Sequence, residues 1–117
     1  TVYSANLPNR GQVQNLPLGA VLESPAVTTS AGLRALAVPP LSSGVAGTLA
    51  QKLAWIETTV EAALEGSREK FVQALVLDES VTSLEAADAL ADDLLAAQAE
   101  HLPQFESVGT KRATAGR

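Results

Sequence analysis

The feature that most constrains the fold of this chain is a change in the spacing of its apolar residues near position 42. Beyond that point apolar residues recur every three or four positions, which is the period of one helical face. They are Val45, Leu49, Leu53, Ile56, Val60 and Leu64. Ser42 or Ser43 is suited to cap this helix, and Gly66 is suited to end it in a left-handed turn. The spacing predicts one long helix with these residues on its inner face.

The residues before this helix carry the signals of strands and turns. Segments 2–8, 20–28 and 33–38 are rich in apolar and β-branched residues, with Gly-containing turns between them. The second and third segments are joined by a short loop that ends at Gly32, and together they predict a β-hairpin. Pro25 lacks a backbone N–H, so we expect an edge position or a bulge for the strand that contains it.

Two shorter helices are predicted after Gly66. Ser67 is suited to cap the first of them, and residues 82–85 (Thr-Ser-Leu-Glu) form a capping-box pattern that begins the second. That helix is expected to run to about Glu100 and to end before Pro103. Its predicted inner face consists of Leu84, Ala87, Leu90 or Ala91, Leu94 and Gln98.

Because strands and helices are segregated along the chain, the predicted fold class is α+β. We expect a small, mostly antiparallel sheet followed by three helices. Residues 1–106 form the expected domain, and residues 107–117 are an expected flexible tail.

Composition excludes several classes of protein. The formal charge of −5 and the absence of a basic stripe argue against nucleic-acid binding. No apolar run approaches the roughly 20 residues of a membrane helix, and no signal peptide is visible. The chain has no cysteine, which fits a reducing compartment and a cytoplasmic location. It begins with Thr1 and contains no Met, so we expect a fragment, a trimmed chain or a processed product.

Polar residues of the helical part admit a functional and a structural interpretation. His101 is the only histidine, and it also fits a solvated helix end. Glu57, Glu61 and Glu65 recur every four positions; they fit a carboxylate cluster, or a solvated stripe in which Glu65 lies close to Arg68. The structural interpretation is favoured in both cases. No catalytic, cofactor-binding or metal-binding residue is assigned.

The loop between the first two strand segments is the more informative region. Asn6, Asn9, Arg10 and Asn15 lie there, and loops on a rigid scaffold often carry function. An Arg fork suits carboxylate, phosphate or sugar hydroxyls, and an Asn amide suits sugars. The alternative is that each Asn holds a turn through hydrogen bonds to the local backbone.

The same loop residues resemble a known family. Residues 9–17 (Asn-Arg-Gly-Gln-Val-Gln-Asn-Leu-Pro) resemble the N-x-G-x-I-x-N-L-P segment of family 4 glycoside hydrolases. Residues 21–26 resemble the V-x-E-x-P-A strand that follows it there, and segments 39–40, 61–66, 74–78 and 102–105 fit the same order. Glu79 departs from the family, which often has Pro at that position. The resemblance covers roughly residues 2–106.

The resemblance implies a fold like the C-terminal part of lactate and malate dehydrogenases. It also implies an enzyme that uses NAD and a divalent metal, commonly manganese, to cleave O-glycosidic bonds by oxidation and elimination. In the family the NAD site, the Cys and His metal ligands and the Tyr base all lie upstream of this segment, in a Rossmann half. Asn9 matches the family motif and Arg10 occupies a variable position, so both are substrate-proximal candidates, Asn9 as holder of the turn and Arg10 for an anionic sugar.

Two functional hypotheses follow. The first is the substrate-side and oligomerisation domain of such a glycosidase, inactive on its own, partnered by its own N-terminal Rossmann half and assembling as a homo-oligomer. The second is a stand-alone helical interaction or dimerisation module without catalytic activity. A glucoside, a galactoside, a galacturonide and a phosphorylated glycoside all remain open as the substrate.

Overall fold

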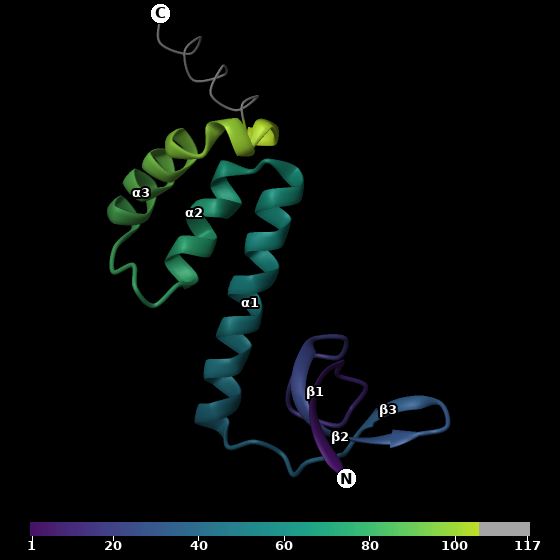
Figure 1. Ribbon diagram of the computed structural model, residues 1–117. Helices are drawn as coiled ribbons and strands as arrows, with labels where there is room; N and C mark the ends of the chain where they lie inside the picture. The colour runs from purple at the N-terminus through teal and green to yellow at the C-terminus, as the bar shows by residue number, and fades with distance from the viewer. Residues whose placement is uncertain (106–117) are drawn as a thin grey trace, which may run out of the picture. The chain divides into compact units, whose positions relative to one another are not determined.

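The computed structural model describes residues 1–105 (Figure 1). The chain divides into two compact units, Thr1–Ala50 and Gln51–Arg117, and the boundary falls within a helix. The tail predicted over residues 107–117 lies outside the described residues. The proposal of one domain over residues 1–106 stays a prediction.

The first unit contains a three-stranded antiparallel sheet. Its strands follow the chain order β1-β2-β3, with Val2 opposite Val27 in the first pair and Ala26 opposite Ala35 in the second. Gly32, in the left-handed region at φ 102°, allows the tight turn of the β2–β3 hairpin. The predicted antiparallel sheet and hairpin are confirmed. The strands are β1 (Val2–Pro8), β2 (Val21–Thr29) and β3 (Gly32–Ala35).

The expected edge position of the strand that holds Pro25 is wrong, because β2 is the central strand. The proline is tolerated for a local reason. The ladder of β3 residues ends at Ala35, one position short of Pro25, and the Pro25 carbonyl accepts a hydrogen bond from the Leu36 N–H at 2.8 Å. Pro25 therefore lies where the β2–β3 ladder ends, so its missing N–H removes a donor only at the end of that ladder.

Three helices follow the sheet, as predicted: α1 (Ser43–Glu65), α2 (Arg68–Leu77) and α3 (Leu84–Ala97). Gly66 ends the first at φ 64°, and the Ser67 hydroxyl caps the second by accepting from the Lys70 N–H. The cap of α3 is Ser83, not the Thr82 of the capping-box pattern. This helix ends three residues early, and two short 3-10 helices follow it: η1 (Ala99–His101) and η2 (Pro103–Phe105).

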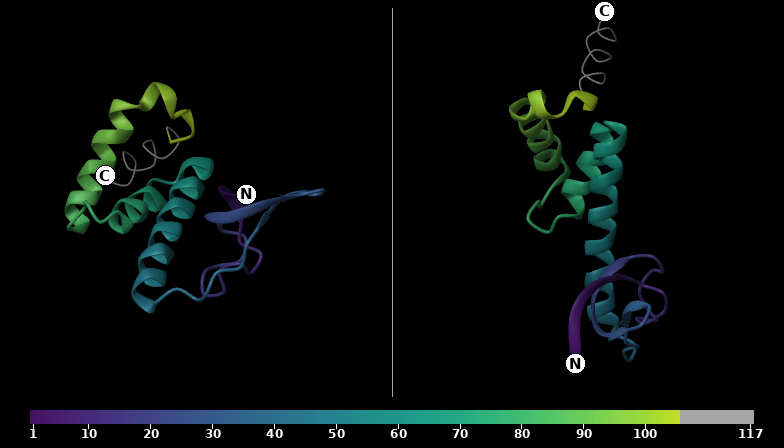
Figure 2. Two further views of the ribbon diagram at one scale, coloured as in Figure 1. Left: turned by 60° about the horizontal axis from the view of Figure 1, so that its bottom comes forward. Right: turned by 45° about the vertical axis from the view of Figure 1, so that its right-hand side comes forward.

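The core of the second unit is built on small side chains where α2 and α3 lie side by side (Figure 2). Ala87 and Ala91 are both 0% exposed and pack with Val72. The predicted inner face of α3 is therefore only partly right. Its alanines are buried, because they let the two helices approach closely, whereas Leu84 and Leu94 are exposed.

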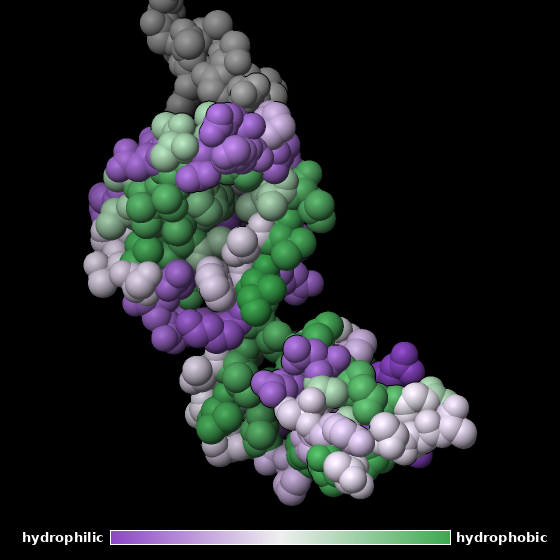
Figure 3. All heavy atoms as spheres, viewed as in Figure 1, coloured by the Kyte–Doolittle hydropathy of each residue, from purple (hydrophilic) through white to green (hydrophobic). Residues whose placement is uncertain are grey.

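The apolar face of α1 is not an inner face in this chain. Ile56, Val60 and Leu64 are 52%, 51% and 80% exposed, and Val45 and Leu49 are exposed as well. Figure 3 shows apolar residues following the helix along the visible face. The spacing identified the helix correctly, but most of its apolar side chains face solvent. Among residues 1–105, no helix combines the length and apolar character that crossing a membrane requires.

Candidate functional site

The side chain of Asn9 organises the loop between β1 and β2. It is 1% exposed and uses both ends of its amide. The Nδ2 group donates to the carbonyl oxygens of Val13, Leu16 and Pro17 at 2.9, 3.1 and 3.1 Å. The Oδ1 atom accepts from the N–H groups of Gly11 and Val13 at 3.1 and 3.2 Å. This geometry favours the turn-holding role expected of Asn9, because its amide is engaged by the loop backbone.

The two ends of the loop are closed by the backbone. The N–H of Asn9 donates to Ala20 at 2.7 Å, and its carbonyl accepts from Gly19 at 2.8 Å. Gln12, also buried, accepts from the Arg10 N–H at 2.7 Å and donates to the Pro8 carbonyl at 2.9 Å. The backbone at Arg10 is therefore fixed from both sides, although its side chain is exposed.

The loop is also tied to the segment that leads into α1. The Asn15 side chain donates to the Leu41 carbonyl at 2.8 Å and accepts from the Leu41 N–H at 3.0 Å. The Val38 N–H donates to the Gln12 carbonyl at 2.9 Å. Asn15, like Asn9, thus holds backbone in place. Asn6 was expected in the loop but lies on β1, where it is exposed and pairs with Glu23 of β2.

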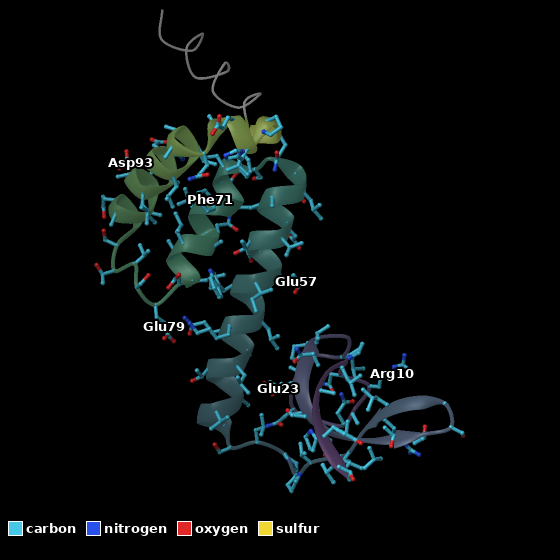
Figure 4. All side chains as sticks on the ribbon, in the orientation of Figure 1. Arg10, Glu23, Glu57, Phe71, Glu79 and Asp93 are labelled. Carbon is cyan, nitrogen blue, oxygen red and sulfur yellow. The ribbon has the colours of Figure 1, made fainter. Side chains whose placement is uncertain are left out.

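Arg10, which was expected to lie near the substrate, lines a cavity of the first unit, and its role in binding stays a prediction. The cavity has a volume of about 700 Å³ and lies between the β1–β2 loop and the β2–β3 hairpin. Its lining includes Arg10, Gln12, Thr29 and Arg34. Figure 4 shows Arg10 away from Glu23, the only acidic residue of the first fifty. Arg10 is thus a lining residue of this cavity without an acidic neighbour from the first fifty residues on that lining.

Arg34 also lines this cavity, and it was not singled out from the sequence. It stands on β3, 24 positions beyond Arg10, and only the hairpin brings the two to one cavity. The sequence did offer one signal for Arg34. Arg10 and Arg34 are the only basic residues among the first fifty, in a chain that is acidic overall.

Four acidic residues of the second unit form ion pairs between helices: Asp88, Asp92, Glu61 and Glu65. Arg68 binds Asp92 at 2.7 Å and Asp88 at 2.8 Å, and the hydrogen bonds that it donates to Asp92 first and Asp88 second raise the pKa of its guanidinium. The expected proximity of Glu65 to Arg68 is not the contact that forms. Glu61 and Glu65 both bind Lys70, each at 2.7 Å, and these hydrogen bonds raise the pKa of Lys70.

The described residues do not fit NAD or a divalent metal. They include no group of three His, Cys, Asp or Glu side chains able to hold a metal ion. His101 is largely exposed and its Nε2 lies 3.1 Å from the Glu100 carboxylate. Gly44 and Gly47 begin a helix that follows an antiparallel hairpin, whereas a dinucleotide loop follows a parallel strand.

Comparison with known proteins gives the same family as the loop motif. A model described as the family 4 glycosyl hydrolase C-terminal domain matches residues 1–81. An alpha-glucosidase of Erwinia rhapontici is 33% identical over 97 residues, which cover 81% of this chain and 21% of that protein.

Solved structures agree in fold. A 6-phospho-alpha-glucosidase from gut microorganisms, in complex with NAD and glucose-6-phosphate, matches with a TM-score of 0.82 at 28% identity, over 91% of this chain and 24% of that one. A 6-phospho-beta glucosidase from Thermotoga maritima, with manganese, NAD+ and glucose-6-phosphate, matches with a TM-score of 0.79 at 24% identity, over 87% and 25% of the two chains.

The sheet, the β1–β2 loop and the helices together have the fold of a glycosidase C-terminal domain. The chain belongs to the family 4 glycosyl hydrolases, as their C-terminal domain. It spans about a fifth to a quarter of the length of the relatives it matches.

Proposed function

We propose that this chain is the substrate-side and oligomerisation domain of a glycosidase that hydrolyses O-glycosidic bonds by NAD-dependent oxidation and elimination. The match of the family's C-terminal domain to residues 1–81 carries the proposal. Relatives crystallised with NAD, manganese and glucose-6-phosphate support NAD and manganese as the cofactors of the complete protein and a sugar as its substrate. The proposed partner is its own N-terminal Rossmann half, and the proposed location is the cytoplasm.

Within that protein, Asn9 and Arg10 are the proposed contribution of this chain to the substrate side. Asn9 fixes the loop, and the loop holds the backbone of Arg10 at the edge of the cavity. Arg10 supplies a charged fork whose chemistry suits an anionic substituent on the sugar. The role of Asn9 is therefore positional, and that of Arg10 is binding.

The isolated 117-residue chain is expected to be catalytically silent. Its described residues do not fit NAD or a metal, so no hydride acceptor and no electrophile can be assembled around a sugar. The measurement is turnover of nitrophenyl glycosides, plain and 6-phosphorylated, with NAD and manganese present. Turnover above a buffer blank would contradict the proposal.

The complete protein that carries this chain is the matching positive control. It should cleave at least one glycoside of the panel with NAD and manganese, and a chelator should abolish that activity. A complete protein that is inactive under all these conditions would favour the stand-alone interaction module instead.

One observation also supports the second function, a stand-alone interaction module. The exposed side chains of Ile56, Val60 and Leu64 form an apolar strip on α1, and an apolar face of this kind marks a contact surface. The strip supports self-association of the isolated chain, whichever of the two functions holds.

We expect a dimer or larger species at micromolar concentrations of the isolated chain, measured by sedimentation. Val60→Glu places a charge in the middle of the strip and is expected to shift the chain to monomer. Ala54→Glu is the matched control, since Ala54 is exposed on α1 about 120° around the helix from Val60. A monomer for the unaltered chain, or equal effects of the two substitutions, would count against self-association through this strip.

A further inference from the structure

We infer that α1 of this chain pairs in parallel with α1 of a second copy, so that Lys52 of each copy lies opposite Glu57 of the other. The inference rests on the oligomerisation role proposed above and deepens it, because it names the partner, the orientation of the two helices and the residues that set this orientation. It follows from the spacing of exposed apolar residues, from the side of α1 that α2 leaves free, and from two charges beside the apolar residues.

The exposed apolar strip of α1 contains a heptad seam. Five apolar residues recur at spacings of four, three, four and three positions, as the a and d positions of a coiled coil do. They are Leu49, Leu53, Ile56, Val60 and Ala63. Ile56 and Val60 are half exposed, and Leu49 and Ala63 are exposed as well. A seam of this spacing is suited to pack against a second helix with the same pattern, and another α1 provides it.

The helix α2 is bound to the opposite side of α1. The Gln51 side chain donates to the Leu77 carbonyl of α2 at 3.3 Å, and Glu65 binds Lys70 of α2 at 2.7 Å. Gln51 and Glu65 lie about 140–180° around the helix from Val60. The seam is therefore free, and α1 is already helical in the single chain. A preformed helix avoids the entropy loss of helix formation, which favours a contact only about two heptads long.

Two opposite charges flank the middle of the seam. Lys52 precedes Leu53 and Glu57 follows Ile56, so they take a g and an e position on the two flanks. In a parallel pair the g flank of one helix faces the e flank of the other, which sets Lys52 opposite Glu57 twice. In an antiparallel pair each flank faces its own counterpart, which brings Lys52 towards Lys52 and Glu57 towards Glu57. Complementary charge therefore selects the parallel orientation.

Both charged groups are accessible for this contact. Glu57 has no ion pair within residues 1–105, and Figure 4 shows its side chain on the side of α1 away from α2. The Lys52 Nζ atom lies 3.9 Å from a Glu79 carboxylate oxygen, which is longer than a hydrogen bond, and 42% of the Lys52 side chain is exposed. These charges favour a pair of helices, because a larger bundle would bury them.

Disulfide cross-linking tests the orientation, because the chain has no cysteine and an introduced one is unique. In a parallel pair Ala63 faces Ala63 of the second copy, so Ala63→Cys is expected to become mostly covalent dimer on mild oxidation. In an antiparallel pair the two cysteines would lie at opposite ends of the seam. Ala54→Cys is the matched control, since Ala54 is exposed on α1 about 120° from Val60 and should remain mostly uncoupled. Equal cross-linking of the two variants, or none of Ala63→Cys, would overturn the parallel pair.

Charge reversal tests the flanking residues, with the dissociation constant of the dimer measured by sedimentation. Lys52→Glu and Glu57→Lys are each expected to raise this constant about fivefold or more, since each turns two attractive pairs into two repulsive ones. The double variant exchanges the charges and should return to within about twofold of the unaltered chain. Glu85→Lys is the control, because it makes the same change of charge at an exposed position of α3. Single variants without effect, or a double variant as weak as either, would overturn the pairing of Lys52 with Glu57.

The outcomes separate this inference from the proposed function. A chain that associates without cross-linking at Ala63 excludes the parallel pair and leaves self-association standing. A chain that is monomeric throughout excludes both. If a thiol reagent then modifies Ala63→Cys in the isolated chain but not in the complete protein, the seam is covered by the N-terminal half and not by a second copy. The glycosidase activity is judged separately, by turnover of the complete protein.

Discussion

Replacement of Asn9 by alanine is expected to lower the stability of the first unit by about 3 kcal/mol or more, since five side-chain hydrogen bonds are lost at a buried position. Each neutral hydrogen bond contributes only about 1 kcal/mol, but the loss leaves buried backbone groups of the loop without a partner. No other side chain of the loop reaches these groups. The cost is therefore well above that of a single lost hydrogen bond.

Hydrogen exchange is the appropriate measurement, because Trp55, the only tryptophan, lies in the other unit. The Asn9 and Gly19 amides close the loop, so they should lose protection in Asn9→Ala. Asn6→Ala is the control, because Asn6 is exposed on β1 and its removal should change stability by no more than about 0.5 kcal/mol. Equal protection in the two variants would show that Asn9 does not organise the loop.

The sequence predicted the elements of the fold well because their signals are local. The helical period, the cap at Ser67 and the left-handed Gly66 depend on neighbouring residues, and all three are confirmed. The position of Pro25 was mispredicted because strand order is not local. The proline rule predicts an edge for the whole strand, whereas here the proline lies in the central strand at the end of the β2–β3 ladder.

Burial was predicted less well than secondary structure. The spacing on α1 identifies an apolar face but does not say whether this chain covers it, and Ile56 and Val60 remain half exposed. The buried side of the second unit consists of alanines at 87 and 91, whose small size hides them from a search for large apolar residues. An apolar face that the chain leaves exposed and an apolar face in the core give the same sequence pattern.

At the candidate site, too, the sequence indicates local features but not which distant segments come together. Asn9 could be singled out because the Asn–x–Gly turn signal spans three residues, although its amide also binds Val13, Leu16 and Pro17. Arg34 was not, because its relation to Arg10 exists only after β2 and β3 pair. Ion pairs behaved likewise: Glu65 was matched to the nearest cation in sequence, but helix geometry brings it to Lys70.

Gly66→Ala is expected to destabilise the second unit by about 3 kcal/mol, for two separate reasons. Gly66 has φ 64°, a left-handed conformation that costs other L-residues roughly 1–2 kcal/mol. An added Cβ would also clash with the backbone carbonyl of Gln104, so the 3-10 helix η2 would have to move. That movement would break the hydrogen bond from Gln104 Nε2 to the Ala63 carbonyl, at 3.0 Å, and the edge-to-face contact of Phe105 with Phe71.

The measurement is denaturant unfolding followed by Trp55 fluorescence, with two further variants that separate the causes. Gly47→Ala lies within α1, where a Cβ meets no atom within 4 Å, so it should raise stability by up to about 1 kcal/mol. Gly66→Asn relieves the left-handed strain but keeps the Cβ, because Asn adopts this conformation readily. If Gly66→Asn is as unstable as Gly66→Ala, the close approach of Gln104 dominates; if it is nearly as stable as the unaltered chain, η2 does not pack on the α1–α2 corner as the structure has it.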